Sequence, residues 1–275
     1  MDKKYKIAVF SDMKESLGNT LKSTLSLAKM LNGDITIFHV KKASEVVTED
    51  SNLSAIRSLN SEFITMDNDI NKIVTAYSKD FGVTMSYSCA IGNLKNEIAT
   101  YIEKEKPDFI VLGKRKSSFF NILGDNLIPF VLKKHKGPIF LTDELNVLDY
   151  GNDLSLGVLS NAEEISIADL TKDLLLYSQK PLKSFKILKN KIVLNKPDTA
   201  KERKEVSFEF EKNANSIKKI STCITKNKIN LLCINRFENK KNKEGKSLSM
   251  PANISELINN INVPLLLMGQ NNYTS

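Results

Sequence analysis

The sequence predicts an α/β protein made of two tandem domains, each a five-stranded parallel sheet with helices on both faces. Short apolar runs alternate with stretches whose apolar residues recur at helical spacing, a pattern typical of parallel sheets with right-handed crossovers. The second half repeats the order of the first half in weaker form. Pro138 in "GPIF" and Pro264 in "VPLL" precede equivalent late strands one domain length apart, which indicates internal duplication.

The first predicted domain spans residues 1–146 and has the clearer pattern. Its strands are short apolar runs such as "KIAVF", and its first helix runs from the N-cap candidate Ser16 to a stop at Gly33. The polar, weakly patterned residues 41–65 predict a long connection. The predicted strands are 6–10, 34–40, 83–91, 108–113 and 137–143. The predicted helices are 16–33, 63–82, 93–106 and 126–136.

The second predicted domain spans residues 147–275, after a polar, glycine-bearing break in "LNVLDYGND". The amphipathic pattern of "NSIKKISTCITKNK" predicts a helix that packs on the sheet. The predicted strands are 154–160, 181–188, 205–210, 229–236 and 262–269. The predicted helices are 163–179 and 215–228.

Composition limits the class of protein. With 41% hydrophobic residues the chain can build a proper core, and no run of 18 apolar residues predicts a membrane span. The N-terminal "MDKKYKIAVFSD" lacks the long apolar region of a signal peptide and is predicted to be a first strand. The three cysteines, Cys89, Cys223 and Cys233, form no C-x-x-C pair, so we expect no disulfide framework, no metal site and a cytoplasmic location.

The net charge of +8 raises the alternative of nucleic acid or an anionic membrane surface as partner. Residues 1–146 carry 20 basic and 18 acidic side chains, and residues 147–275 carry 20 and 14. The excess is interspersed with acids, and no aromatic stacking motif accompanies it. We therefore expect neither a membrane nor a nucleic acid partner.

Four segments together resemble the universal stress proteins, the UspA-like family. They are "KIAVFSDMKES", "LAKMLNGDITIFHV", "IGNLKNEIATYIEKEKPDFIVLGKRK" and "LGDNLIPFVLKKHKGPIFLTD". The resemblance is good over residues 4–143 and weaker over 152–269. It implies a tandem, Rossmann-like member with the adenine nucleotide alpha hydrolase-like arrangement. It also implies that the two domains pair within the chain as a pseudo-dimer, and that a homodimer or other protein partners are open alternatives.

In nucleotide-binding members of this family, the loop after the fourth strand has the pattern G-x2-G-x9-G-[ST], whose glycines let backbone N–H groups reach phosphates. Gly113 matches the first glycine, but Lys116 stands where the second should be. Gly124 follows too early, and Asp125, before Asn126, takes the Ser/Thr position. A carboxylate about 4 Å from a phosphate costs roughly 1–4 kcal/mol. Lys114, Arg115 and Lys116 can instead hold an anion through their side chains.

Two more positions match ligand-contacting positions of the family. Asp12 follows the first strand, where the resemblance implies a carboxylate near adenosine, and Val40 ends the second strand, where it implies packing against adenine. Both are predicted at the carboxyl ends of strands, where α/β proteins bind ligands. The alternatives are a turn carboxylate and a core valine. In the second half Asn161 replaces the acidic residue and only Gly245 follows the fourth strand, so a degenerate domain is expected there.

The sequence has no G-x-S-x-G, H-E-x-x-H or Walker motif, so we do not expect an efficient enzyme, although slow ATP hydrolysis stays open. His39, at the end of a predicted strand, is expected to take part in strand packing, with a position facing the crevice as the alternative. His135 is expected to lie at a solvated helix end. The sequence predicts a stress-response module that senses a ligand or binds a protein. The alternative is a protein that binds ATP or AMP through the Gly113–Gly124 loop. No cofactor is required in the first case, and an adenine nucleotide is the cofactor in the second.

Overall fold

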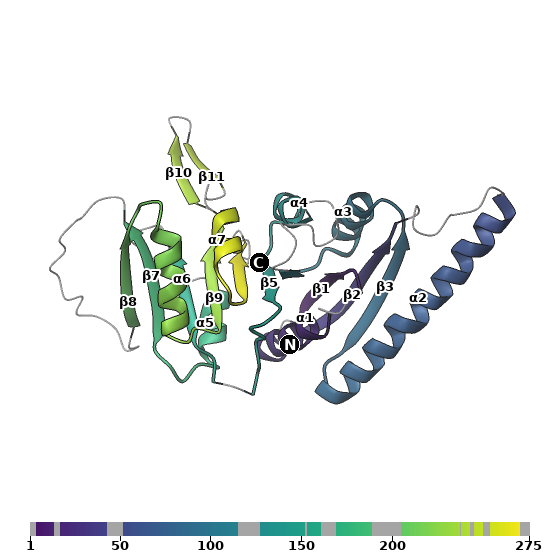
Figure 1. Ribbon diagram of the computed structural model, residues 1–275, viewed down its shortest axis with the longest axis horizontal. Helices are drawn as coiled ribbons and strands as arrows, with labels where there is room; N and C mark the ends of the chain where they lie inside the picture. The colour runs from purple at the N-terminus through teal and green to yellow at the C-terminus, as the bar shows by residue number, and fades with distance from the viewer. Residues whose placement is uncertain are drawn as a thin grey trace. The chain divides into compact units, whose positions relative to one another are not determined.

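The computed structural model describes ten stretches of the chain and divides into two compact units, Met1–Glu144 and Leu145–Ser275 (Figure 1). The described residues are 4–13, 17–42, 52–114, 127–151, 153–160, 169–188, 205–236, 238–242, 245–249 and 254–269.

The first unit contains five parallel strands in the order β3-β2-β1-β4-β5. The strands are β1 (Tyr5–Ser11), β2 (Gly33–Lys41), β3 (Met85–Ile91), β4 (Phe109–Lys114) and β5 (Ile139–Asp143). The helices are α1 (Leu17–Leu31), α2 (Asn52–Phe81), α3 (Leu94–Glu105) and α4 (Leu127–Lys134). The α/β class and the parallel sheet predicted from the sequence are confirmed.

Helices cover both faces of this sheet, with α1 and α2 on one side and α3 and α4 on the other (Figure 1). The inner strands β2, β1 and β4 are buried on both faces, as shown by the successive buried residues Ala8 and Val9 of β1 and Ile110 and Val111 of β4, and by Ile37 of β2. Strands that are covered on both faces need continuous apolar runs, and "KIAVF" and "FIVL" are such runs.

Helix α3 shows how the sequence sets the ends of an element. The Asn93 side chain accepts hydrogen bonds from the backbone N–H groups of Lys95 and Asn96, which have no partner inside the helix. At the other end, Lys106 adopts a left-handed conformation with φ of 47°, and its N–H bonds to the carbonyl of Ile102.

The expectation of a long connection at 41–65 is wrong for residues 52–65, because α2 begins at Asn52 and extends over 30 residues. This stretch contains neither glycine nor proline, so nothing in it interrupts a helix. Its large apolar residues Ile56, Phe63 and Ile64 are 54%, 42% and 61% exposed. At 100° per residue Ile56 and Phe63 lie within about 20° of the buried Val74, so they continue the face that later turns bury, in turns that the unit leaves exposed.

The second unit also has five parallel strands, in the order β12-β9-β6-β7-β8. An antiparallel pair, β10 with β11, is an addition that the sequence analysis did not predict. The strands are β6 (Leu156–Ser160), β7 (Leu182–Leu188), β8 (Glu205–Glu211), β9 (Leu231–Asn235), β10 (Glu238–Asn242), β11 (Gly245–Ser249) and β12 (Leu265–Met268). The helices are α5 (Asp169–Leu175), α6 (Ser216–Lys226) and α7 (Ile254–Asn260).

Buried aromatic and aliphatic residues form the core of this unit. Phe185 of β7 is fully buried, with its ring 5.4 Å from that of Phe208 in β8, and Ile220 and Leu265 are also fully buried. Among the helices that the structure describes, none is both long enough and apolar enough to cross a membrane.

Candidate functional site

The strand order of the first unit creates a switch point between β1 and β4, because the chain winds outward from β1 in one direction and from β4 in the other. At such a point the loops after the two strands diverge and leave a crevice at their carboxyl ends. Ser11 pairs with His39 of β2, and Val9 pairs with Val111 of β4. The residues that end β2, β1 and β4 therefore lie along one edge of the sheet.

A cavity of about 250 Å³ opens at this edge, between the ends of β1 and β2 and helix α2. Asp12 follows β1 directly, so its predicted position at the crevice agrees with the cavity lining. The helix contributes residues at spacings of three and four, which is one helical face. The lining residues are Asp12, Met13, His39, Lys41, Glu62, Thr65, Met66, Asp69 and Ile70.

The turn after β1 is held by local hydrogen bonds. Met13 has a positive φ of 59°, and its backbone N–H donates to Ser11 Oγ at 3.0 Å. The carbonyl oxygen of Ser11 lies 2.8 Å from His39 Nδ1. A carbonyl can only accept, so His39 Nδ1 carries a proton. His39 lines the cavity, in agreement with the alternative that it faces the crevice.

The cavity is rich in hydrogen-bond acceptors and carries more acidic than basic groups. Lys41 forms an ion pair with Glu62, and Lys72 lies 3.2 Å from Asp69. Asp12 adds a third carboxylate to these two pairs. Among the described residues no group of three His, Cys, Asp or Glu side chains is arranged to hold a metal ion. The cavity thus suits a ligand that donates hydrogen bonds, and it disfavours a phosphate at the same place.

Val40 is 7% exposed and is not among the residues that line the cavity. His39 and Lys41 line it from the two neighbouring positions, and successive side chains of a strand point to opposite faces. Phe38, which shares the face of Val40, stacks on Tyr101 of α3 with ring centroids 4.2 Å apart. Val40 therefore belongs to the α3 side of the sheet, and a contact between Val40 and a ligand stays a prediction.

Gly113, near the end of β4, is required by packing. A Cβ at this position would come within 2.9 Å of Thr20 Oγ1, whose hydroxyl is 3.0 Å from that of Thr142. Lys114 Nζ lies 3.6 Å from Asp143, and both side chains are nearly buried. This ion pair leaves Lys114 less able to bind an anion. Four of the predicted loop positions and the neighbouring asparagine lie outside the described residues: Arg115, Lys116, Gly124, Asp125 and Asn126.

Comparison with known proteins bears on the fold. No family model matches the sequence, and no curated protein matches it. A universal stress protein from Archaeoglobus fulgidus DSM 4304 superposes with a TM-score of 0.71 at 12% identity, over 97% of each chain. The chain has the universal stress protein fold. A functionally unknown protein from Pseudomonas aeruginosa PAO1 shares this fold with a TM-score of 0.59 at 10% identity, over 96% of this chain and 92% of that one.

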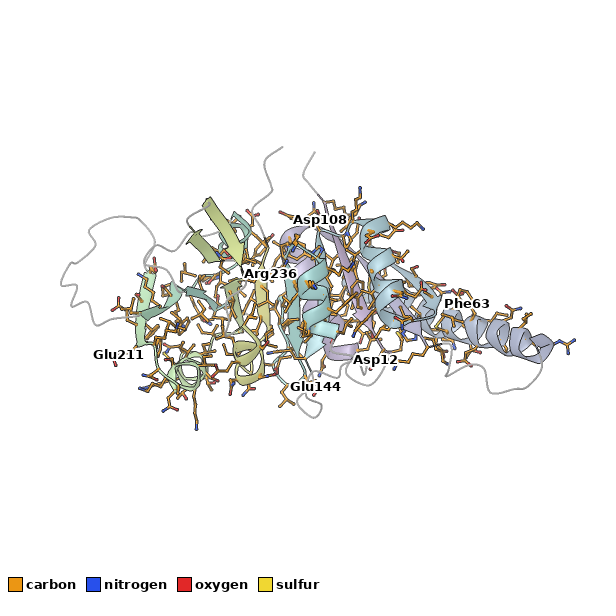
Figure 2. All side chains as sticks on the ribbon, turned by 90° about the horizontal axis from the view of Figure 1, so that it is seen from above. Asp12, Phe63, Asp108, Glu144, Glu211 and Arg236 are labelled. Carbon is orange, nitrogen blue, oxygen red and sulfur yellow. The ribbon has the colours of Figure 1, made fainter. Side chains whose placement is uncertain are left out.

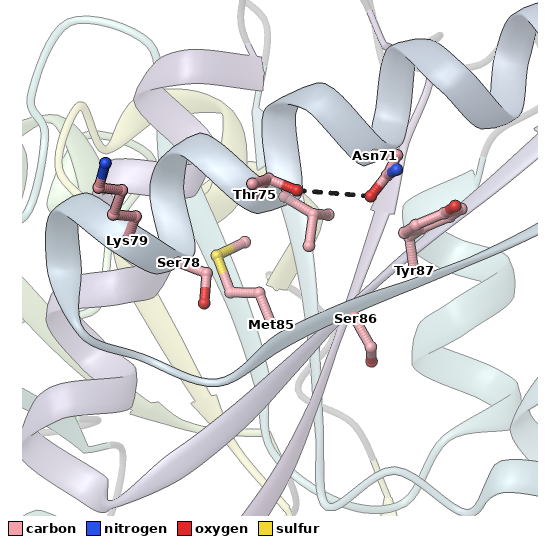
Figure 3. A pocket seen from close by; sticks show the side chains of 8 residues that line it. Asn71, Thr75, Ser78, Lys79, Met85, Ser86 and Tyr87 are labelled. Carbon is pink, nitrogen blue, oxygen red and sulfur yellow. Dashed lines mark hydrogen bonds between the residues drawn. The ribbon is translucent and has the colours of Figure 1, made fainter.

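The first unit has a second hollow, away from the carboxyl ends of the strands. It is an open groove of about 600 Å³ between α2 and β3 (Figure 3). Thr75 Oγ1 donates to Asn71 Oδ1 at 3.4 Å, and Ser78 Oγ donates to the carbonyl of Val83 at 2.9 Å. Burial and a hydrogen bond to Asp67 raise the pKa of Tyr87. The groove lies at the amino end of β3, whereas α/β proteins bind ligands at the carboxyl ends of strands, so the cavity at the strand ends is the better candidate site.

In the second unit, the position after β9 corresponds to the loop that follows β4 in the first unit. Arg236 stands there and is fully buried, and burial lowers its pKa to about 10. The group still carries its charge at neutral pH. Its burial was not predicted, since "CINR" offers no signal besides an arginine after an apolar run. Asn161, which replaces the acidic residue in this half, lies outside the described residues.

Sequence reasoning missed most of the cavity lining, although part of the signal was present. His39 and Lys41 alternate at the end of a predicted strand, which places them on the same face. The α2 residues could have been found from their helical spacing once the helix was extended toward residue 52. The missed lining residues are Met13, Lys41, Glu62, Thr65, Met66, Asp69 and Ile70.

Proposed function

We propose that this chain is a universal stress-type protein that senses a small ligand by binding its adenosine portion in the cavity at the ends of β1 and β2. The observation that carries the proposal is the cavity itself, which lies beside the switch point of the fold and is lined by Asp12 and His39. Its volume of about 250 Å³ lies close to the lower end of small-molecule sites. A compact ligand of nucleoside size suits it better than a large cofactor.

The hydrogen-bond acceptors of the cavity favour the parts of a ligand that carry donor groups. Carboxylates such as Asp12 and Asp69 accept hydrogen bonds from amino and hydroxyl groups, which a purine and a ribose both offer. A phosphate about 4 Å from Asp12 would be repelled by roughly 1–4 kcal/mol. Any phosphate would therefore have to extend toward the loop after Gly113. ATP or AMP is thus a second candidate, with binding that depends on that loop.

Calorimetric titration with adenosine, AMP and ATP tests the proposal. We expect adenosine to bind, and Asp12→Asn to weaken it by about 10–100-fold, the equivalent of about 1.4–3 kcal/mol for hydrogen bonds to a charged group. Asp80→Asn is the matched control, because it removes the same charge from an exposed position of α2 outside the cavity. Equal affinity for adenosine in wild type and the Asp12 variant would overturn the proposed site. Binding of ATP alone, without adenosine, would favour the second candidate.

A further inference from the structure

His39 is the most buried polar residue that lines the cavity at the ends of β1 and β2, with 9% of its surface exposed. Its Nδ1 donates to the carbonyl oxygen of Ser11 at 2.8 Å, and this bond fixes the orientation of the ring. Its other ring nitrogen, Nε2, forms no hydrogen bond within the part of the chain that the structure describes. Buried polar atoms normally have a partner, so the unused Nε2 indicates a group that pairs with a ligand.

A second polar group lies beside His39 at the same edge of the sheet. Asp12 follows β1 directly (Figure 2) and also lines the cavity. Ser11 pairs with His39, and neighbouring strands lie about 4.7–4.9 Å apart, so Asp12 and His39 reach the cavity from adjacent strand ends. Two polar groups in this arrangement match a ligand that carries two neighbouring polar groups.

The ribose of a nucleoside has such a pair in its 2′ and 3′ hydroxyls, whereas adenine carries a single amino group. A hydroxyl both donates and accepts hydrogen bonds, so it pairs with Nε2 whether or not that nitrogen carries a proton. An amino group of a purine only donates. On the α2 side the cavity is lined by the buried Met66 and Ile70, which suit the apolar face of a base.

We propose that His39 is a specificity-determining residue, whose Nε2 shares a hydrogen bond with one ribose hydroxyl while Asp12 accepts a hydrogen bond from the other. This inference rests on the proposed function, and it narrows the ligand class to ribonucleosides with both hydroxyls free. A 2′- or 3′-deoxyribonucleoside leaves one of the two protein groups without its partner and therefore binds more weakly.

Calorimetric titration of the full chain with adenosine, 2′-deoxyadenosine and 3′-deoxyadenosine tests the inference. Wild type should bind adenosine about 3–10-fold more tightly than the analogue that lacks the hydroxyl facing His39. His39→Asn keeps an N–H group at the position of Nδ1 for the bond to Ser11, but it has no atom at the position of Nε2. In this variant one of the two analogues should bind as tightly as adenosine, while the other keeps its wild-type penalty.

Thr65→Val is the matched control, because Thr65 lines the same cavity but its hydroxyl already donates to the carbonyl of Ser61 at 3.0 Å. It should keep the wild-type affinity ratios. Wild-type ratios in His39→Asn would overturn the inference and leave the proposed function standing, as would equal affinity of wild type for all three nucleosides. A wild type that binds none of them would overturn the proposed function and this inference with it.

Nitrogen-15 NMR of the histidine side chains gives a second readout on the wild-type protein, which has only two histidines. Adenosine should shift the Nε2 resonance of His39 and leave that of His135, which is not among the lining residues. A His39 Nε2 resonance that stays unchanged at saturating adenosine would overturn the inference. Circular dichroism verifies that each variant is folded before its titration is interpreted.

Discussion

Replacing Gly113 with alanine tests whether this glycine serves packing or a ligand. The added Cβ would lie 2.9 Å from Thr20 Oγ1, closer than real Cβ contacts. Thr20 is buried and its hydroxyl bonds to that of Thr142, so moving it would break this hydrogen bond and disturb its packing. Overpacking destabilises the fold by about 1–3 kcal/mol, and the lost hydrogen bond by about 0.5–1.5 kcal/mol. Alanine also lowers the entropy of the unfolded chain, which stabilises the fold by about 0.4–1 kcal/mol. We expect a net loss of about 2 kcal/mol.

The assay is equilibrium unfolding of the first unit, followed by circular dichroism against temperature and urea. A loss of 2 kcal/mol lowers its midpoint by about 4–8 °C at this size. Adding Thr20→Ala removes the clashing hydroxyl. The loss of unfolding free energy in the double variant should therefore be about 1 kcal/mol smaller than the sum of the losses in the two single variants. Gly18→Ala is the control: its nearest atom is Tyr77 Oη at 3.5 Å, and the helix should gain about 0.5–1 kcal/mol. Additive effects, or an unchanged Gly113→Ala midpoint, would refute the packing role.

Two further predictions concern the second unit and helix α3. Burial raises the pKa of the Cys233 thiol to about 12, against 9.0 for an ordinary thiol, so the unfolded chain loses this proton first and stability falls as the pH rises above 9. Relative to Cys233→Val, the free energy of unfolding of the wild-type second unit should fall by about 1.4 kcal/mol per pH unit between pH 9 and 12. If the free energies of unfolding of the two proteins change with pH in parallel, the buried thiol is contradicted. Asn93→Ala should destabilise the first unit by about 1 kcal/mol in urea unfolding, because two backbone N–H groups lose their cap, whereas Asn93→Asp should retain most of the stability.

The sequence predicts those parts of the fold that depend on local signals. Helix α3 begins one residue after Asn93, as its capping side chain indicates, and Leu94 and Ile98 are buried on one face. The strand "DFIVLG" becomes β4 because a run of apolar residues with a β-branched centre can be buried on both faces. Asp12 is also predictable, since a residue after the first strand must lie at the crevice edge.

The rest depends on which distant residues the fold brings together. Glu62 and Asp69 reach the cavity only because α2 crosses the ends of β1 and β2, and their sequence surroundings give no sign of this contact. The need for glycine at position 113 comes from Thr20, more than ninety residues away in the sequence. The first turns of α2 were missed for a related reason. Ile56 and Phe63 have the spacing of the helical face that holds the buried Val74, but polar residues surround them in the sequence and the unit leaves them exposed.

The central claim is that the cavity at the ends of β1 and β2 binds the adenosine portion of a small ligand. A crystal structure of the protein grown with adenosine tests it most directly. We predict the nucleoside in this cavity, with an amino or hydroxyl group within hydrogen-bonding distance of the Asp12 carboxylate and α2 lying over it. A nucleoside found in the groove between α2 and β3, or an empty cavity at saturating adenosine, would contradict the claim.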